Sequence, residues 1–263
     1  MSAKMADILN AVLTKYAGTN IDLDFPSVGA TENIIMAAVM AEGETVITNA
    51  ALEAEVEDLG KFLNKMGAKI TGLGTNTIRI KGVKSLNEVS YNIMPDRIEA
   101  GTILCAAAVS GGRVLLKNVI PEHLTPVLYK LEECGCTVET DKKTIILKAG
   151  RRLNATDIKT MPYPGFPTDM QPVFTGMLTL AKGTSIVTEN IFESRFKYAG
   201  ELGKMGAKIN IEGKTAVVKG VKKLSGTTVI ATDLRGGAAM VVTRTCRQRY
   251  NQSKKYRIYF KRI

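Results

Sequence analysis

The stretch at residues 161–171 contains the carboxylate best placed to do chemistry, that of Asp169. It reads MPYPGFPTDMQ and contains three prolines and one glycine. Because proline fixes its own backbone and keeps its predecessor extended, no helix can form before Pro167. We expect a helix to begin at Thr168 or Asp169, where either side chain could cap it and negative charge is favoured. Judged locally, Asp169 is more simply a helix cap than a general acid or base.

Four predicted helix starts, together with Arg97, Arg195 and Arg235, are a second candidate site. Those starts are residues 26–31, 95–101, 166–169 and 232–237. The first turn of a helix exposes backbone N–H groups and the positive end of the helix dipole. Together with guanidinium groups, which bind phosphate and carboxylate through two hydrogen bonds, these starts predict a site for an anionic substrate. The alternative is that Asp96 with Arg97, and Asp233 with Arg235, form structural ion pairs.

An internal repeat explains why the helix starts are equivalent. Gly67, Gly135 and Gly206 lie in similar settings, KMGAKI, ECGCTV and KMGAKI, and are separated by 68 and 71 residues. The same period relates TIRIKG at 77–82 to TIILKA at 144–149 and TAVVKG at 215–220. The chain therefore uses one supersecondary module of about 70 residues three times. Within a module the order is helix, strand, helix, strand, strand, with a further strand leading into the next module.

The hydrophobic pattern of the module predicts which elements are buried. The first helix is apolar all round at 34–41 and 103–109, so we expect burial on every side. Residues 77–81 alternate like a strand with one solvated face. The second helix is amphipathic and ends at Gly67, its apolar face in the first module being Leu52, Val56, Leu59, Phe62, Leu63 and Met66. Helices inside and sheets outside follow, which makes an inside-out α/β barrel built from repeated units.

Composition narrows the functional classes. The chain has 263 residues and 45% hydrophobic content, enough for one large or two modest domains. No apolar run approaches the roughly 20 residues of a membrane span, and the N-terminus lacks a signal-peptide block. The four cysteines (Cys105, Cys134, Cys136, Cys246) and the single His123 show no metal-ligand spacing, which favours reduced thiols in a cytoplasmic protein.

The net charge of +11 belongs mainly to the C-terminal tail. Residues 244–263 carry eight lysines and arginines and no acid, leaving +3 for the rest of the chain. A body so nearly balanced argues against nucleic acid as the main partner. A tail that binds RNA or a membrane surface is the competing interpretation, with Tyr250, Tyr256, Tyr259 and Phe260 between basic residues.

Five motifs in order resemble the UDP-N-acetylglucosamine 1-carboxyvinyltransferase family of enolpyruvyl transferases. They are DFPSVGATEN, MPDRIEAGT, GFPTDMQ, ENIFESRF and ATDLRGGA, and the resemblance runs from about Gly18 to about Val242. It implies two domains, each an inside-out barrel of three repeated units, with the active site between them. Residues 1–94 would be one unit of the family's second domain, and 95–242 two units and the start of a third from its first domain. Residues 243–263 would be a non-native tail.

The resemblance also implies roles for individual residues. Asp169 resembles the acid/base carboxylate that also bonds the 3-hydroxyl of the aminosugar, and Arg195 and Arg235 resemble the arginines that handle phosphoenolpyruvate. The implied substrate-binding residues are Ser27, Val28, Gly29, Asp169, Ile191 and Arg97. The implied reaction adds the sugar hydroxyl of UDP-N-acetylglucosamine to C2 of phosphoenolpyruvate while C3 is protonated, and phosphate then leaves. A carboxylate base and arginines suit this cell-wall reaction without a metal or other cofactor.

Some motifs of the family have no counterpart in this sequence. These are a lysine–asparagine pair and a loop cysteine that acts as acid or adds to phosphoenolpyruvate; Cys105, in an apolar helix, is not that cysteine. We therefore expect no turnover from this chain alone, with complementation by an N-terminal fragment as one possibility. The related shikimate-pathway transferase and a non-catalytic remnant that binds nucleotide sugar are the alternatives.

The tail after Thr243 has no helical or strand period. Reading plausible codons one nucleotide later gives GLVGRGITKVKNIEYILRGY, a glycine-bounded strand ending in Asn-Ile as elsewhere in the repeat. We therefore interpret this tail as a shifted reading frame, and sequencing the gene tests that interpretation.

Overall fold

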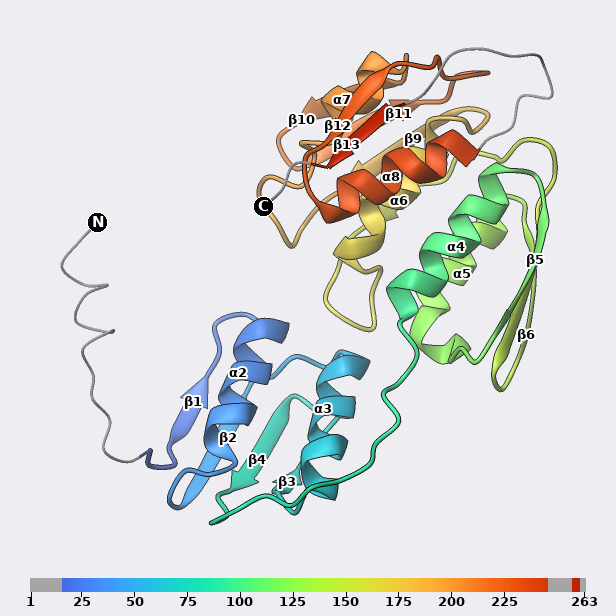
Figure 1. Ribbon diagram of the computed structural model, residues 1–263. Coiled ribbons are helices and arrows are strands. Elements are labelled where there is room, and N and C mark those ends of the chain that lie inside the picture. The colour runs from blue at the N-terminus through green and yellow to red at the C-terminus, as the bar shows by residue number, and fades with distance from the viewer. Residues whose placement is uncertain (1–15, 246–256, 261–263) are drawn as a thin grey trace. The chain divides into compact units, whose positions relative to one another are not determined.

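The chain folds into two compact units, Met1–Met94 and Pro95–Ile263, which we call unit 1 and unit 2. The computed structural model describes residues 16–245 and 257–260 (Figure 1). Each unit has its own hydrophobic core among these residues. The two units are described separately below.

Unit 1 is a four-stranded sheet with two helices packed on one face (Figure 1). The strand order is β1-β2-β4-β3, with β1 parallel to β2 and the other pairs antiparallel. Ile35, Ile47, Ile78 and Ile80 are fully buried between the helices and the sheet. The elements are β1 (Asn20–Asp22), α2 (Val28–Ala38), β2 (Glu44–Thr48), α3 (Ala54–Lys65), β3 (Lys69–Thr71) and β4 (Thr77–Lys81).

Unit 2 contains two further complete modules and the start of another. Its first module is α4 (Arg97–Val109), β5 (Arg113–Lys117), η1 (Pro121–Leu124), α5 (Thr125–Glu133), β6 (Thr137–Asp141) and β7 (Thr144–Lys148). The second is β8 (Ile158–Lys159), η2 (Thr168–Met170), α6 (Gln171–Leu178), β9 (Thr184–Thr188), α7 (Ala199–Lys204), β10 (Lys208–Glu212) and β11 (Thr215–Lys219). The third begins with β12 (Thr228–Ala231), α8 (Leu234–Thr245) and β13 (Arg257–Phe260).

The three modules repeat the same sheet, as the sequence period predicts. The orders β2-β4-β3, β5-β7-β6 and β9-β11-β10 are equivalent, and every pair in them is antiparallel. Gly67, Gly135 and Gly206 each follow the second helix with φ of +105°, +90° and +93°. The glycine spacing therefore marks one left-handed backbone position that recurs in every module.

Helices lie inside unit 2 and sheets outside, which confirms the inside-out arrangement. The equivalent helices α4, α6 and α8 pack against one another, and every residue of α6 is buried. Close packing needs small residues: a Cβ on Gly176 would lie 3.0 Å from the Ala239 carbonyl oxygen of α8. β9 alternates between buried and exposed positions, as a strand with one solvated face should.

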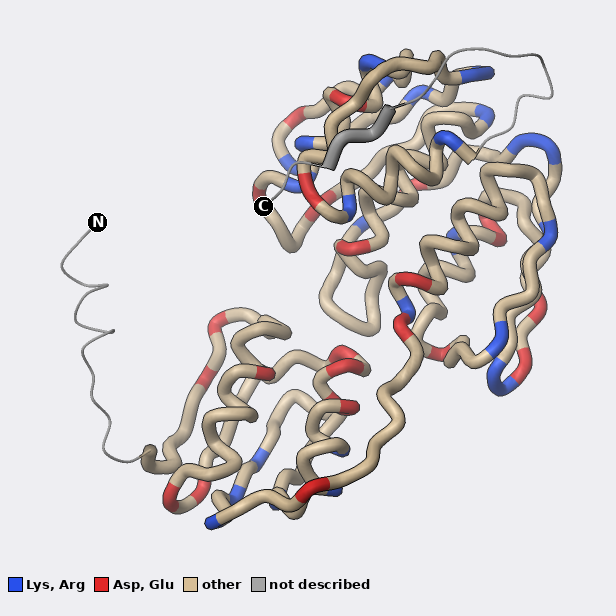
Figure 2. Tube along the Cα trace, viewed as in Figure 1, with Lys and Arg blue, Asp and Glu red and all other residues tan. Residues whose placement is uncertain are grey.

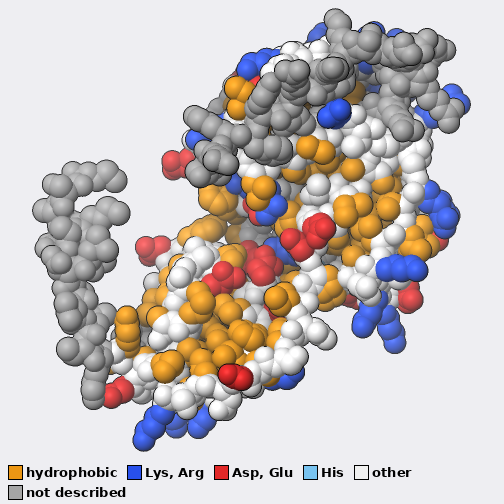
Figure 3. All heavy atoms as spheres, viewed as in Figure 1, with side chains coloured by type: hydrophobic (Ala, Val, Ile, Leu, Met, Phe, Trp, Pro, Cys, Tyr) orange, Lys and Arg blue, Asp and Glu red, His pale blue; other side chains and the backbone are white. Residues whose placement is uncertain are grey.

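The outer face of α2 is exposed, contrary to the expected burial on every side. Met36 is 50% exposed and Met40, just beyond the helix, 57%. Figure 3 shows hydrophobic side chains gathered over this part of unit 1. In unit 2 the equivalent helices cover one another, whereas the described part of unit 1 holds a single module. Within the described part of unit 1, the apolar outer face of α2 therefore has no equivalent helix against it.

The tail is more regular than its sequence predicts. α8 continues to Thr245, and residues 257–260 form β13, which pairs in parallel with β12. These four residues therefore form a strand although the tail sequence has no strand period. β13 takes the place beside β12 that β9 has beside β8 and β2 has beside β1. Cys246, the N-terminal segment 1–15 and the remaining tail residues on which the shifted frame and the RNA-binding arm rest lie outside the described residues.

Charge is dispersed over the described chain. Figure 2 shows lysines and arginines mainly at turns and strand ends, with acidic residues among them. Among the described residues, every helix is too short or too polar to span a lipid bilayer.

Replacing Gly206 by alanine tests the left-handed position. Gly206→Ala should lower the free energy of unfolding by about 1 kcal/mol, because alanine disfavours this backbone conformation. The added Cβ would meet no atom within 4 Å, so steric contact adds nothing. Gly203→Ala in α7 has equally open surroundings and should raise the free energy by roughly 0.5 kcal/mol. Urea unfolding followed by circular dichroism compares the two, and shifts of the same sign would contradict the assignment.

Candidate active site

Asp169 lies in η2, a single turn of 3-10 helix before α6. In this described stretch no side chain caps η2 or α6, so the predicted capping role of Asp169 is wrong. Its Oδ1 accepts a hydrogen bond from Nη2 of Arg195, and its Oδ2 accepts one from Nη2 of Arg235 at 2.6 Å. The structure thus brings together the three residues predicted to be catalytic.

Arg195 reaches Asp169 from the loop between β9 and α7. Its side chain is 18% exposed, and its Cζ lies 5.0 Å from the centroid of the Phe192 ring. Its Nε is buried, and no acceptor among the described residues lies within hydrogen-bonding reach. A buried donor without a partner is costly, so this nitrogen is suited to an oxygen of an anionic ligand.

Arg235 lies in the first turn of α8, where positive charge is unfavourable for the helix dipole. The Asp169 carboxylate offsets that charge. Asp233 does not pair with Arg235 among the described residues; its Oδ1 accepts from the Gly236 backbone N–H at 2.8 Å and so caps the helix. The structural ion pair proposed for Asp233 and Arg235 is therefore wrong, and Arg235 turns toward the site.

Arg97 begins α4 and is buried beside the proline-rich loop. Its guanidinium Cζ lies 5.4 Å from the centroid of the Tyr163 ring. Asp96 caps α4, its Oδ1 accepting from the backbone N–H groups of Ile98 and Glu99 at 2.7 and 3.0 Å. The starts of α4, α6 and α8 therefore all contribute side chains near residues 163–169.

Ile191 lies in the same loop as Arg195, and its backbone N–H is already engaged. It donates to Oε1 of Glu189 at 2.9 Å. Glu189 is fully buried, and sequence reasoning missed it. The repeat contained a signal, because Asn49 and Asn118 occupy the equivalent position in the other two modules. A residue that departs from its module at the end of a strand was a candidate for a special role.

A buried tyrosine supports the start of α6. The Tyr198 hydroxyl donates to Oε1 of Gln171 at 3.0 Å, and both side chains are fully buried. Burial raises the pKa of the Tyr198 hydroxyl well above its ordinary value, so it stays a neutral donor. Gln171 follows Asp169 by two residues, and this contact therefore anchors the turn that carries the carboxylate.

Ser27, Val28 and Gly29 lie in unit 1, not in the unit that holds Asp169. Ser27 caps α2, its Oγ accepting from the Ala30 backbone N–H at 3.3 Å. A Cβ on Gly29 would meet no atom within 4 Å, so the backbone there is open to approach. An open helix start with a serine cap suits a phosphate-bearing ligand.

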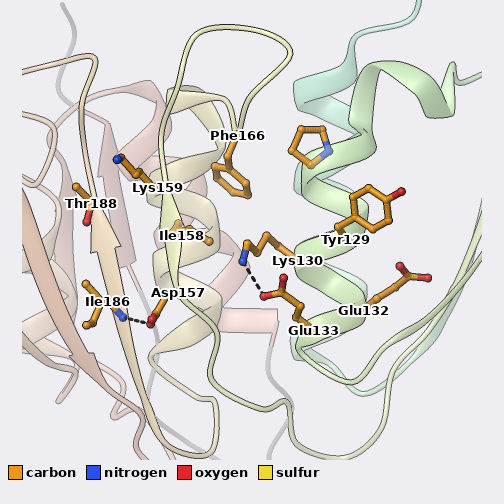
Figure 4. Close-up of a pocket in the computed structure, with 11 residues that line it drawn as sticks. Tyr129, Lys130, Glu132, Glu133, Asp157, Ile158, Lys159, Phe166, Ile186 and Thr188 are labelled. Atoms are coloured by element: carbon orange, nitrogen blue, oxygen red, sulfur yellow. Dashed lines mark hydrogen bonds and ion pairs between the residues drawn. The ribbon is translucent and has the colours of Figure 1, made fainter.

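A groove within unit 2 is lined by other residues than these. It has a volume of about 750 Å³ and runs between α5 and strands β8 and β9 (Figure 4). Its lining includes Tyr129 and Glu132 of α5 and Ile186 and Thr188 of β9. It contains none of the predicted site residues, and Phe166 is the lining residue closest to Asp169 in sequence. The position of this groove therefore does not indicate where the reaction takes place.

The described cysteines lie in the core. Cys105, Cys134 and Cys136 are buried free thiols. Burial, with the neighbouring Cys134 and Cys136, raises the pKa of the Cys105 thiol. A thiol held neutral in this way is a poor nucleophile. Among the described residues there is also no cluster of metal-ligand type.

Comparison with known proteins identifies the family. A family model described as EPSP synthase (3-phosphoshikimate 1-carboxyvinyltransferase) matches residues 4–249. The chain belongs to this family. The match includes the whole range of about 18 to 242 over which the motifs resemble the family.

The chain is also similar to curated members of the family and to solved structures. It is 56% identical over 228 residues to UDP-N-acetylglucosamine 1-carboxyvinyltransferase 1 of Caldanaerobacter subterraneus subsp. tengcongensis, covering 87% of this chain and 55% of the relative. It is 55% identical over 232 residues to the corresponding protein 1 of Symbiobacterium thermophilum, covering 88% and 53%. The chain therefore spans about half the length of the curated relatives it matches.

A solved structure supports the fold. The enolpyruvyl transferase NikO from Streptomyces tendae superimposes with a TM-score of 0.78 at 24% identity, over 88% of this chain and 58% of that one. At this level of identity the likeness concerns the fold alone. It agrees with the inside-out α/β arrangement of unit 2.

Removing the Asp169 carboxylate tests the site as a structural unit. Asp169→Asn should lower the free energy of unfolding by about 1 kcal/mol, because Arg195 and Arg235 lose their shared partner. The matched control is Glu139→Gln, which breaks the exposed ion pair with Lys148 in the same unit. This control should change the free energy of unfolding by less than about 0.5 kcal/mol. Urea unfolding measures both, and equal effects would contradict a specific role for Asp169.

Proposed function

We propose that this chain is part of an enolpyruvyl transferase of peptidoglycan synthesis. The enzyme would move the enolpyruvyl group of phosphoenolpyruvate to the 3-hydroxyl of UDP-N-acetylglucosamine. The observation that carries the proposal is the Asp169 carboxylate bound by Arg195 and Arg235. The names of curated relatives at 56% and 55% identity support the choice of nucleotide sugar.

Asp169 would act as the base for the sugar hydroxyl. As the hydroxyl oxygen bonds to C2 of phosphoenolpyruvate, its proton passes to the carboxylate, and C3 gains a proton from a separate acid. Loss of a proton from C3 and departure of inorganic phosphate then give the enolpyruvyl ether. A base positioned at the reacting hydroxyl contributes to both the addition and its reversal.

The arginines would bind the anionic groups of phosphoenolpyruvate. Arg195 presents a buried Nε that has no acceptor among the described residues, and Arg235 lies at the start of α8. A phosphate or carboxylate oxygen would compete with Asp169 for these guanidinium groups. Substrate binding would then free one carboxylate oxygen to accept the hydroxyl proton. Arg97, beside the same loop, would add positive charge.

The residues that the family resemblance assigns to the nucleotide sugar are Ser27, Val28, Gly29 and Ile191. Ser27, Val28 and Gly29 at the start of α2 would hold the uridine diphosphate, and the Ile191 backbone would contact the sugar. The Ile191 N–H already bonds Glu189, so the carbonyl oxygen is the group left for that contact.

A second polypeptide that carries the rest of the family's length would complete the enzyme. The exposed outer face of α2 supports this idea, because the equivalent helices of unit 2 are covered by one another. The family motifs that supply a loop cysteine and a lysine–asparagine pair have no counterpart in the printed sequence. We therefore expect no turnover by this chain alone, and a cytoplasmic location remains a prediction.

Reconstitution tests the proposed function. Purified chain mixed with a polypeptide spanning the remaining half of a relative should release phosphate from phosphoenolpyruvate only when UDP-N-acetylglucosamine is present. Asp169→Asn should slow this release by about 10²- to 10⁴-fold, the usual contribution of a positioned general base. Asp141→Asn, at the exposed end of β6, removes a carboxylate of the preceding module and should leave the rate unchanged.

Three outcomes decide between the alternatives. Phosphate release that depends on 3-phosphoshikimate instead would favour the shikimate-pathway activity. Binding of nucleotide sugar without any release in the reconstituted pair would favour a non-catalytic remnant. Release by the unsupplemented chain would overturn the expectation that it needs a partner.

A further inference from the structure

Glu189 is a buried carboxylate at the end of β9, next to the proposed active site. We propose that Glu189 is a positioning residue that fixes Asp169, Ile191 and Arg195 relative to one another, an inference that rests on the proposed function. The residue is fully buried, so it acts through its neighbours and not on the substrate.

The carboxylate of Glu189 is surrounded by donors from two segments. Its Oε1 accepts from the Thr160 hydroxyl at 2.9 Å and from the backbone N–H groups of Ile191 and Phe192 at 2.9 and 3.1 Å. The Thr168 hydroxyl lies 3.1 Å from each carboxylate oxygen. These hydrogen bonds compensate the cost of burying the charge.

Each donor belongs to a part of the site. Thr168 immediately precedes Asp169, so its hydrogen bond fixes the turn that presents the catalytic carboxylate. The Ile191 and Phe192 N–H groups fix the loop that leads to Arg195, and the Phe192 ring lies against the Arg195 guanidinium. One side chain therefore connects the two segments whose side chains meet in the Asp169–Arg195 pair.

Thr160 strengthens the same connection. While its hydroxyl donates to Glu189, it accepts from the Asn190 backbone N–H at 2.8 Å. The Asn190 side-chain amide also donates to the Thr160 carbonyl at 3.0 Å. The end of β8 and the end of β9 are thus cross-linked on both sides of Glu189, which leaves little freedom in the placement of the loops that follow.

The other modules show that the fold itself does not require a glutamate here. The equivalent Asn49 and Asn118 have φ of +54° and +56°, a conformation that asparagine tolerates well. The Asn49 amide donates to the Leu23 carbonyl at 2.6 Å, so in unit 1 this position also ties the strand end to the preceding segment. Among the three modules, only the one that carries Asp169 has a carboxylate at this position. The Glu189 carboxylate accepts from two hydroxyls and two backbone N–H groups at once.

The test compares Glu189→Ala with a matched control in the full chain. Ser185→Ala removes another buried polar side chain of β9, whose Oγ accepts from the Thr156 N–H at 3.2 Å, away from the site. Nitrogen-15 NMR would follow the Ile191 and Phe192 amides and the Arg195 guanidinium Nη signals, which sharpen when rotation is slowed by the Asp169 pair. Calorimetry would measure phosphoenolpyruvate affinity.

Glu189→Ala should lose the resolved Arg195 Nη signals and weaken phosphoenolpyruvate binding by about tenfold. Ser185→Ala should retain the resolved Arg195 Nη signals and the phosphoenolpyruvate affinity of the unaltered chain. If Glu189→Ala keeps the Arg195 signals of the unaltered chain, the positioning role is overturned. If those signals are lost but neither the unaltered chain nor the reconstituted pair binds phosphoenolpyruvate, the positioning role stands and the proposed function is wrong.

Milder variants keep the proposal testable if Glu189→Ala does not fold. Glu189→Gln keeps an acceptor for the two backbone N–H groups, and Thr168→Val removes only the link to the Asp169 turn. We expect Glu189→Gln to retain the Arg195 signals, and Thr168→Val to lose them with affinity weakened by about threefold. A Thr168→Val chain indistinguishable from the unaltered one in both measurements would overturn the role.

Discussion

One carboxylate shared between two guanidinium groups is the interaction that the packing of unit 2 has to position. Asp169, Arg195 and Arg235 come from three segments spread over 67 residues of sequence, yet two oxygens of one side chain bind both arginines. Such a contact tolerates little displacement, because charge-assisted hydrogen bonds are short and directional. The tight packing of α6 against α8, and the anchoring of the loops by Glu189 and Tyr198, are the physical conditions that this contact requires.

The repeated module supplies the scaffold and then departs from it where chemistry is needed. All three modules share the sheet order and the glycine after the second helix. At the end of the first module strand, two copies carry asparagine and one carries Glu189. At the helix starts, α2 has a serine cap, α4 an aspartate cap, and η2 an aspartate that caps nothing. The fold is thus held constant while single positions acquire new partners.

Features that depend on local sequence could be predicted, and features that depend on distant partners could not. The glycine period, the amphipathic second helix and the alternation of 77–81 each follow from backbone or hydrophobic periodicity. The capping role of Asp169 and the pairing of Asp233 with Arg235 were wrong, because the true partners lie 26 and 66 residues away. The expected burial of α2 was wrong on its outer face for a similar reason, because an apolar helix is buried only where another element packs against it. The family resemblance, not the local pattern, pointed to Asp169.

The most direct measurement of the central claim is a crystal structure of the chain with phosphoenolpyruvate. The account predicts the ligand's phosphate or carboxylate oxygens on Arg195 and Arg235, one of them near the Arg195 Nε, with at least one Asp169 oxygen released from its arginine. Electron density for the ligand in the groove between α5 and β9, with the Asp169 pairs intact, would contradict it.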